Sequence, residues 1–244
     1  MTMRILALDT STRSCSVALL EGEELVVETA VCVAQTHSAH LVAMVEQALR
    51  FAGWNPGRLE GLAVGVGPGS FTGLRIGIAT AKGIAYAAGI PCVGVGSLEA
   101  LAASLLPRDE TLCALIDARR GELYAAVYRA QGEQLIPLLP ERATPIAALL
   151  AGLKGPHLFI GDGALLHAAD IRAALGTGAR FAPVGQHAPR AAVIGRLARK
   201  FLPQAAVDRG FTIRPRYLRG ADAEALRTAR SAPDEGGDRV PKAD

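Results

Sequence analysis

Aromatic residues and cysteines are both scarce in this sequence. Aromatic side chains make up 5% of the 244 residues, too few to indicate the basic, aromatic-bearing face of a stand-alone RNA-binding module. The four cysteines stand far apart among apolar neighbours, at Cys15, Cys32, Cys92 and Cys113. This spacing shows neither a paired metal motif nor a short disulfide framework, so we expect reduced cysteines in the core.

The sequence also shows neither a signal peptide nor a membrane span. Residues 1–9 lead directly into a strand-like pattern, without the basic region and long apolar run of a secretion signal. A long uncharged stretch, between Lys82 and Glu99, falls short of about 18 residues and contains Gly89 and Pro91. We therefore expect a cytoplasmic protein that does not bind a membrane.

The hydrophobic pattern predicts two successive halves that both open with three strands. In the first half, strands are predicted at 4–9, 15–20, 25–33, 62–66 and 91–94, and helices at 38–51, 72–88 and 97–105. In the second half, strands are predicted at 112–117, 122–129, 134–138, 157–160 and near Phe181, and helices at 144–153, 164–175 and 188–201. This order predicts an α/β protein in which a mixed sheet flanked by helices occurs twice, and it suggests an internal duplication.

The chain is predicted to divide into two lobes and a tail. We expect an N-terminal lobe over residues 1–105 and a C-terminal lobe over residues 106–219. From residue 220 to residue 244 the apolar content falls and charges of both signs crowd together. That composition predicts a disordered tail.

The segment from Gly67 to Arg75, with the sequence GPGSFTGLR, lies between a predicted strand and a predicted helix. Its glycines permit tight turn geometry, and Ser70 or Thr72 can cap the free amides at the helix start. A helix start of this kind can also bind an anion. A plain strand-to-helix turn is the simpler interpretation.

The helix that follows carries a small residue at every fourth position, at Gly73, Gly77, Ala81, Ala85 and Gly89. Such a row forms a shallow groove that lets another element approach closely. The chain's own sheet could fill this groove, but apolar residues occupy the other faces of the helix as well. We therefore expect a second subunit to cover Gly73, Gly77, Ala81 and Ala85, together with Leu41 and Val45 of the preceding helix.

Four segments together carry a resemblance to a known family. They are ILALDTST at residues 5–12, the segment at residues 67–75, DARRGELY at residues 117–124 and PRYLR at residues 215–219. In this order, over about the first 219 residues, the chain resembles the TsaB family, also called YeaZ. The resemblance implies a two-lobed fold of the actin, hexokinase and Hsp70 type, known as the ASKHA fold.

The resemblance also implies a function and a set of partners. TsaB is similar to TsaD, the subunit that transfers threonylcarbamoyl to the adenosine next to the anticodon of tRNA, and it supports TsaD as a non-catalytic partner. The ATPase TsaE joins the assembly, so ATP or ADP is expected at the level of the complex and not on the isolated chain. The resemblance therefore implies a TsaD heterodimer, indirect contact with tRNA and a homodimer when the chain is alone.

Two absences weigh against the alternative of a stand-alone enzyme: the missing glycine of a phosphate-binding turn counts against a small-molecule kinase, and the missing His pair counts against a metallopeptidase. The His-x-x-x-His metal motif of TsaD corresponds to residues 97–101 here, which begin with Ser97 and end with Leu101. The pair His37 and His40 has no nearby acidic cluster to complete a metal site. We expect no catalytic residue and no metal site.

The first phosphate-facing turn of this superfamily usually contains glycine, whereas this chain has DTST at residues 9–12. Asp9 and Ser11 are therefore weak candidates for nucleotide binding. A later turn at Gly161, Asp162 and Gly163 resembles the position of a second nucleotide-contacting loop, although a plain turn would look the same.

Two further polar groups have a structural and a functional interpretation. For Asp117, Arg119, Arg120, Glu122 and Tyr124 we favour a turn between two strands, tied by a salt bridge, over a base with an anion clamp. The formal net charge of +3 and the scattered basic residues do not form a nucleic-acid footprint. Within a complex, Arg214, Arg216 and Arg219 are the first candidates for tRNA contact, with packing or solvation as the alternative.

Overall fold

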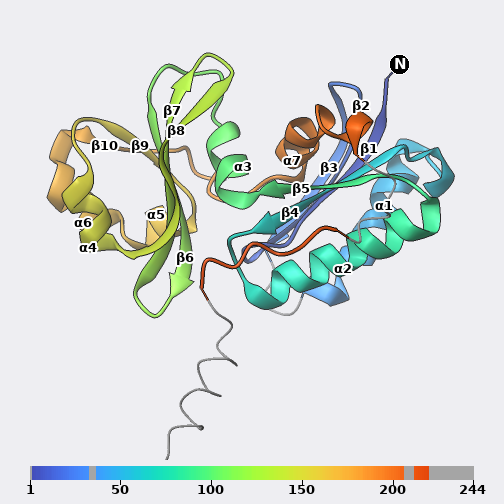
Figure 1. Ribbon diagram of the computed structural model, residues 1–244, viewed down its shortest axis with the longest axis horizontal. Coiled ribbons are helices and arrows are strands. Elements are labelled where there is room, and N and C mark those ends of the chain that lie inside the picture. The colour runs from blue at the N-terminus through green and yellow to red at the C-terminus, as the bar shows by residue number, and fades with distance from the viewer. Residues whose placement is uncertain (1, 33–36, 206–211, 220–244) are drawn as a thin grey trace, which may run out of the picture.

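A computed structural model, which describes residues 2–32, 37–205 and 212–219, contains two lobes side by side (Figure 1). Each lobe is built on a sheet of five strands with helices on both faces. The expected tail at residues 220–244 lies outside the described residues. The predicted α/β class, with a mixed sheet in each lobe, is confirmed.

The first sheet has the strand order β3-β2-β1-β4-β5. Its strands are β1 (Arg4–Asp9), β2 (Ser14–Glu21), β3 (Glu24–Cys32), β4 (Gly61–Gly67) and β5 (Cys92–Gly96). The β1–β2 and β2–β3 pairs are antiparallel, whereas β1–β4 and β4–β5 are parallel. The sheet is therefore mixed, and its parallel strands are joined by helical crossovers, as parallel strands require.

Alternation along the strands sends apolar side chains into two separate cores. Leu6 and Leu8 of β1 pack with helices α1 (Leu41–Ala52) and α2 (Phe71–Ala88) on one face of the sheet. Ile5 and Ala7 pack on the other face with helix α7 (Ala191–Arg199) and with α3 (Ser97–Ala103). Both faces are covered, so all five residues of β1 after Arg4 are buried.

The second sheet has the order β10-β9-β6-β7-β8. Its strands are β6 (Thr111–Arg119), β7 (Glu122–Gln131), β8 (Gln134–Pro145), β9 (His157–Ile160) and β10 (Ala179–Phe181). Leu98 and Leu101 of α3 pack on one face. Helices α4 (Ile146–Gly152), α5 (Asp162–Leu166) and α6 (Ala168–Leu175) cover the other face. Because α3 contributes to the cores of both lobes, it connects the two sheets.

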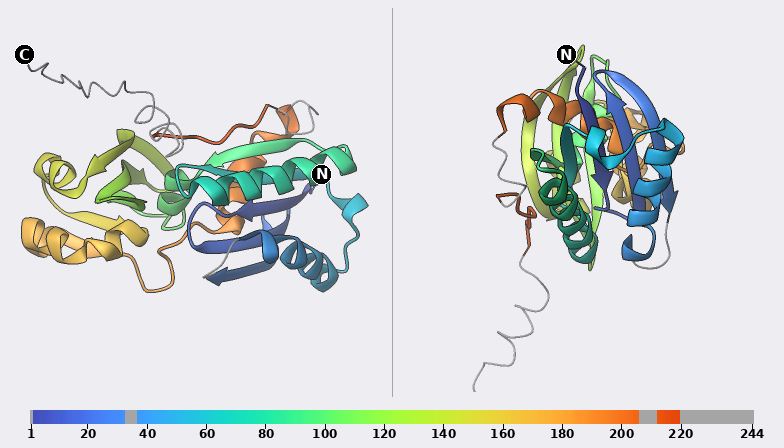
Figure 2. Two further views of the ribbon diagram at one scale, coloured as in Figure 1. Left: turned by 90° about the horizontal axis from the view of Figure 1, so that it is seen from below. Right: turned by 90° about the vertical axis from the view of Figure 1, so that its right-hand side faces the viewer.

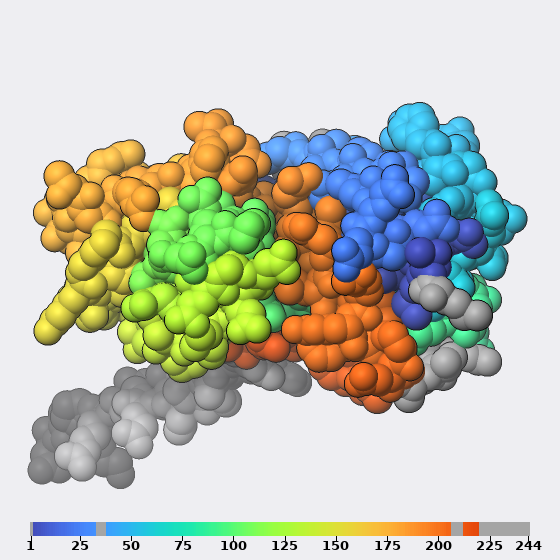
Figure 3. All heavy atoms as spheres, turned by 90° about the horizontal axis from the view of Figure 1, so that it is seen from above, coloured from blue at the N-terminus to red at the C-terminus, as the bar shows by residue number. Residues whose placement is uncertain are grey.

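Helix α7 corrects the predicted boundary between the lobes. It falls inside residues 106–219, which were assigned to the C-terminal lobe, yet Ala191 and Ile194 pack on the first sheet. A chain that leaves the first sheet and returns after a second lobe gives no local signal of the return. In the space-filling view, this orange segment lies beside the blue N-terminal residues (Figure 3).

Residues 212–219, the C-terminal strap, also return to the first lobe before they reach the second. Ile213 is 8% exposed and belongs to the core beneath α1 and α2. The Arg216 N–H donates to Val66 O at 2.7 Å, and the Tyr217 ring stacks on Phe71 with 5.0 Å between centroids. Figure 2 shows the strap running along α2. Arg219 then reaches the second lobe, where it donates to Ala118 O at 2.8 Å.

Most predicted elements agree with the structure within a few residues, with two differences. The helix predicted at 164–175 is divided into α5 and α6 at His167, whose side chain bonds Asp170 at 3.0 Å. Strand β8 continues to Pro145, so Thr144 lies in a strand and not in a helix.

All four cysteines are free as expected, but Cys32 is exposed at the end of β3, an edge strand. Within the described residues, no helix combines the length and apolar character needed to cross a membrane.

The position of Ile213 predicts that the strap stabilises the first lobe. Ile213→Ala removes buried apolar atoms, so we expect a loss of roughly 2–5 kcal/mol in the free energy of unfolding, measured by urea denaturation. Val184→Ala is the matched control, because Val184 is fully exposed. Equal, small losses for the two variants would show that the strap does not belong to this core.

Candidate functional site

The turn after β1 is the first candidate site, and it lies in the interior of the protein. Asp9, Thr10 and Ser11 are each 0% exposed. The Ser11 backbone N–H and hydroxyl both donate to Asp9 Oδ1, at 3.1 and 2.9 Å. Asp9 Oδ2 is buried and has no hydrogen-bond partner among the described residues. Burial raises the pKa of the Asp9 carboxyl from 3.8 to about 7, partly offset by the two bonds from Ser11.

The segment that begins α2 closes over this turn. Ser70 N–H donates to Ser11 O at 2.7 Å, and the Thr10 hydroxyl donates to Gly73 O at 2.7 Å. A Cβ atom on Gly69 would lie 2.2 Å from Ser11 O. Only glycine permits so close an approach of two backbones. The Ser70 side chain caps α2 by accepting from Gly73 N–H at 3.2 Å, which confirms one of the two predicted caps.

This arrangement does not fit a nucleotide phosphate at Asp9 and Ser11. In the ASKHA fold, phosphate approaches the backbone of the first turn, but here Ser70 already donates to that turn. Asp9 and Ser11 have no exposed surface with which to meet a ligand. The sequence showed that this turn lacks glycine; the structure adds the close approach of Gly69 to Ser11 as a second obstacle.

The second candidate turn, Gly161 to Gly163, is also packed against its own sheet. Gly161 has φ 111°, and a Cβ there would lie 1.9 Å from Leu115 O. Its N–H donates to His187 Nδ1 at 3.2 Å. Asp162 Oδ1 accepts from Asp117 N–H at 3.0 Å, and burial raises the pKa of the Asp162 carboxyl. These groups hold β6, α5 and the segment before α7 together, which favours the plain-turn interpretation.

The turn between β6 and β7 contains the dense polar group seen in the sequence. Arg119 and Arg120 both have positive φ, at 65° and 55°. Asp117 accepts from Arg119 N–H at 2.8 Å and pairs with the Arg119 guanidinium at 3.4 Å. The predicted turn with a salt bridge is confirmed. Glu122 takes part in a different contact, an ion pair with Arg219 at 3.1 Å.

The six residues expected at a partner interface are buried inside the first lobe, which corrects that prediction. Leu41, Val45, Gly73, Gly77, Ala81 and Ala85 all face the chain's own sheet and core. A Cβ on Gly77 would lie 2.3 Å from Thr10 Oγ1. The small residues therefore let α2 approach β1, which was the alternative use of the groove.

A second row of small residues on α2 faces outward. Ala79, Gly83 and Ala87 are four residues apart and exposed, and exposed Arg75 lies in line with them. A row offset by two residues lies about 200° around an α-helix, on the opposite face. Tyr86 beside this row is 55% exposed, and on α1 Val42 and Phe51 are 54% and 69% exposed. Sequence reasoning missed this surface because both rows on α2 have the same spacing.

The three candidate arginines for tRNA are largely committed to contacts within the chain. Arg216 Nη1 donates to Glu141 Oε2 at 2.7 Å, and Arg219 pairs with Glu122. Arg214 is exposed and donates to Ile213 O at 3.2 Å. For Arg216 and Arg219 the packing alternative therefore agrees better with the structure.

The positions that correspond to a metal motif are in the core. Ser97 and Leu101 are both 0% exposed, and Ser97 Oγ has no hydrogen-bond partner in the described part of the chain. Across residues 2–32, 37–205 and 212–219, no group of three His, Cys, Asp or Glu residues is placed to hold a metal ion. One serine hydroxyl beside apolar side chains does not supply the ligands that a zinc site requires.

The two five-stranded sheets with their flanking helices define a class of protein, the two-lobed ASKHA fold. The structure of component A of (R)-2-hydroxyglutaryl-CoA dehydratase from Acidaminococcus fermentans shares this fold, with a TM-score of 0.52 at 11% identity, over 83% of this chain and all of that one. YeaZ from Pseudomonas aeruginosa is more similar, with a TM-score of 0.73 at 27% identity, over 88% of this chain and all of that one.

Sequence comparison gives the particular family. The chain matches the family model described as TsaD, tRNA N6-adenosine threonylcarbamoyltransferase, over residues 31–226. It is 35% identical to the tRNA threonylcarbamoyladenosine biosynthesis protein TsaB of Bacillus subtilis, over 91% of this chain and 97% of that protein. The TsaB protein of Escherichia coli is 40% identical over 52% of this chain and 55% of its own length. The chain belongs to the TsaB family.

The opposite orientations of Gly77 and Gly83 predict opposite effects of the same substitution. Gly77→Ala places a methyl group against Thr10, so we expect a loss of roughly 1–3 kcal/mol in the free energy of unfolding. A Cβ on Gly83 would meet no atom within 4 Å, so Gly83→Ala should gain up to about 1 kcal/mol from helix propensity. Thermal or urea unfolding distinguishes the two, and a stabilising Gly77→Ala would contradict the inward orientation.

The buried carboxyl of Asp9 predicts a pH dependence of stability. The pKa of Asp9 is higher in the folded state than in the unfolded state. The contribution of the protonated carboxyl to the free energy of unfolding is therefore complete below about pH 4, the ordinary carboxyl pKa, and is lost as the pH rises through 7. Asp9→Asn should therefore flatten the fall in unfolding free energy between about pH 5 and pH 8, by up to about 1.4 kcal/mol per pH unit. Urea unfolding across this range measures the effect. Exposed Glu133, changed to Gln, is the control; an unchanged slope in Asp9→Asn would contradict the assignment.

Proposed function

We propose that this chain is a non-catalytic partner subunit that binds TsaD and supports the formation of N6-threonylcarbamoyladenosine on tRNA next to the anticodon. Family membership supports the pathway, because the similar B. subtilis protein is named for tRNA threonylcarbamoyladenosine biosynthesis. The observation that carries the non-catalytic role is the closure of the turn after β1, whose Asp9, Thr10 and Ser11 are 0% exposed.

The exposed side of α1 and α2, which we call the outer helix face, is the surface we propose for TsaD. It includes Val42 and Phe51 of α1, and Ala79, Gly83 and Tyr86 of α2. Helices α1 and α2 cover the same face of the first sheet. Their exposed apolar side chains form a surface that a partner can desolvate. Small residues at Ala79 and Gly83 allow a partner helix to approach closely.

We further propose how the chain takes part in a larger assembly. In the absence of TsaD, the same outer helix face allows the chain to form a homodimer, since a self-complementary patch is sufficient for two-fold pairing. TsaE joins through the complex, and ATP or ADP acts there. The chain meets tRNA only as part of the complex, and there Arg214 is the remaining candidate from the strap for a tRNA contact. We propose that this role is carried out in the cytoplasm.

A substitution on the outer helix face tests the partner role. Gly83→Leu adds a bulky side chain where the chain itself leaves open space, so the fold should survive while binding to TsaD falls at least tenfold. Light scattering of the variant mixed with TsaD from the same organism measures the complex. Ala147→Leu, at an exposed alanine of α4, is the matched control and should bind normally. A Gly83→Leu variant that binds TsaD like the wild type would contradict this surface.

A further inference from the structure

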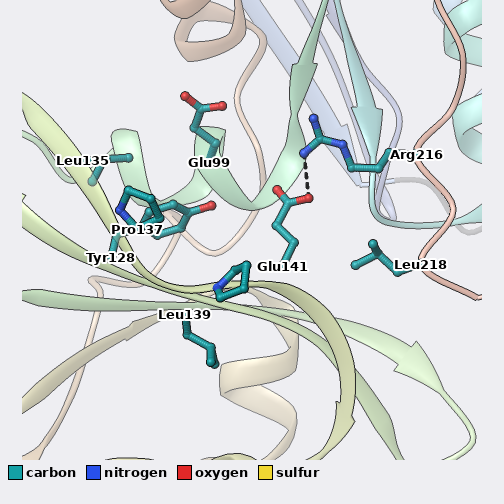
Figure 4. Close-up of a pocket in the computed structure, with 9 residues that line it drawn as sticks. Glu99, Tyr128, Leu135, Pro137, Leu139, Glu141, Arg216 and Leu218 are labelled. Carbon is teal, nitrogen blue, oxygen red and sulfur yellow. Dashed lines mark hydrogen bonds and ion pairs between the residues drawn. The ribbon is translucent and has the colours of Figure 1, made fainter.

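A pocket of about 500 Å³ lies where the two lobes and the strap meet (Figure 4). Glu99 enters it from α3, Tyr128 from β7, Glu141 from β8 and Arg216 from the strap. Its remaining walls are apolar, formed by Leu135, Pro137, Leu139, Pro140 and Leu218. The pocket lies away from the outer helix face, because no described residue of α1 or α2 lines it.

The charged side chains of the pocket gather around Gly96 at the end of β5. A Cβ atom on Gly96 would lie 3.1 Å from Glu141 Oε1, 3.3 Å from Arg216 Nη1 and 3.7 Å from Glu99 Cβ. Arg216 Nη1 donates to Glu141 Oε2 at 2.7 Å. One ion pair joins Arg216 and Glu141, and the Arg216 guanidinium also attracts the Glu99 carboxylate, without a direct bond between them. The three side chains carry a net charge of −1.

Tyr128 supplies an independent observation that points to a ligand. Its side chain packs in the core of the second lobe and is only 7% exposed. Figure 4 shows its hydroxyl directed into the space between Glu99 and Glu141. Within residues 2–32, 37–205 and 212–219 the hydroxyl makes no hydrogen bond, and it borders the open pocket, so a ligand there can reach it. Burial raises the pKa of Tyr128, and the carboxylates of Glu141 and Glu99 raise it further, so the hydroxyl stays protonated and can also accept a hydrogen bond.

These observations select a cation. An anion would meet two carboxylates, and the guanidinium that could attract it is already bonded to Glu141. A cation would balance the net charge of −1 beside Glu99 and would donate to the Tyr128 hydroxyl, which makes no other hydrogen bond in the described part of the chain. The apolar walls suit an aliphatic chain that carries the charge.

We propose that this pocket binds an ammonium or guanidinium group carried on a short aliphatic chain, held by the Glu99 carboxylate and the Tyr128 hydroxyl. Such a group occurs on a free alkyl amine or guanidine and on a lysine or arginine side chain of a polypeptide. The ligand would touch α3, the second sheet and the strap together. The site does not depend on the partner role proposed above.

The test compares a cation with its neutral isostere on the full chain. Butylguanidinium and butylurea have nearly the same shape, so a titration followed by ligand-detected NMR isolates the charge. We expect saturable binding of butylguanidinium and at least tenfold weaker binding of butylurea. Equal binding of the two compounds, or no saturable binding of either, would overturn the proposal without any variant.

Variants then place the binding in this pocket. Glu99→Gln should weaken butylguanidinium binding at least tenfold, and Tyr128→Phe should weaken it several-fold. Glu133→Gln, which neutralises an exposed glutamate outside the pocket, should bind like the wild type. Circular dichroism melts verify that each variant is folded. Unchanged affinity in folded Glu99→Gln protein would overturn the assignment.

A final comparison identifies the source of the group. Acetyl-leucyl-arginine amide presents the same guanidinium on a polypeptide backbone. If the peptide binds at least tenfold more tightly than butylguanidinium, the proposal is supported and the ligand is a polypeptide side chain. Weaker binding than that of butylguanidinium supports it with a small free cation as the ligand. Neither result depends on TsaD, so the outcome is separate from that of the partner test.

Discussion

The close contact between the turn after β1 and the start of α2 determines how the rest of the first lobe is arranged. Two glycines make it possible: Gly69 lies against the backbone of Ser11, and Gly77 lies against Thr10. The hydrogen bonds from Ser70 to Ser11 and from Thr10 to Gly73 then fix the helix on the sheet. Because this contact leaves Asp9, Thr10 and Ser11 without exposed surface, it also removes the room that phosphate would need.

The same contact decides which side of α2 is available to another molecule. With Gly73, Gly77 and Ala81 against the sheet, Ala79 and Gly83 must face outward. The strap reinforces this geometry, since Tyr217 stacks on Phe71 at the start of α2 and accepts a hydrogen bond from Arg75 Nε at 3.1 Å. A helix held at its start in this way offers a defined outer surface.

Much of this arrangement could be predicted from the sequence, and the rest depends on contacts between distant segments. The continuous apolar run at residues 5–8 located β1, and the GPGSFTGLR segment located the start of α2. The sequence could not show which small-residue row of α2 faces inward, because the Gly77 row and the Gly83 row have identical spacing. Nor could it show that α7 returns to the first sheet, or that Arg216 pairs with Glu141 across 75 residues.

The non-catalytic partner role is tested most directly by measuring tRNA modification by TsaD from the same organism, with TsaE and the threonylcarbamoyl adenylate supplied. The assay compares the wild-type chain, the Asp9→Asn chain and no chain, and light scattering verifies that each complex forms. If the chain is a non-catalytic partner, modification should require the chain, and Asp9→Asn should support it at the wild-type rate, because Asp9 is a buried structural residue. Loss of modification by an intact Asp9→Asn complex would contradict the non-catalytic role.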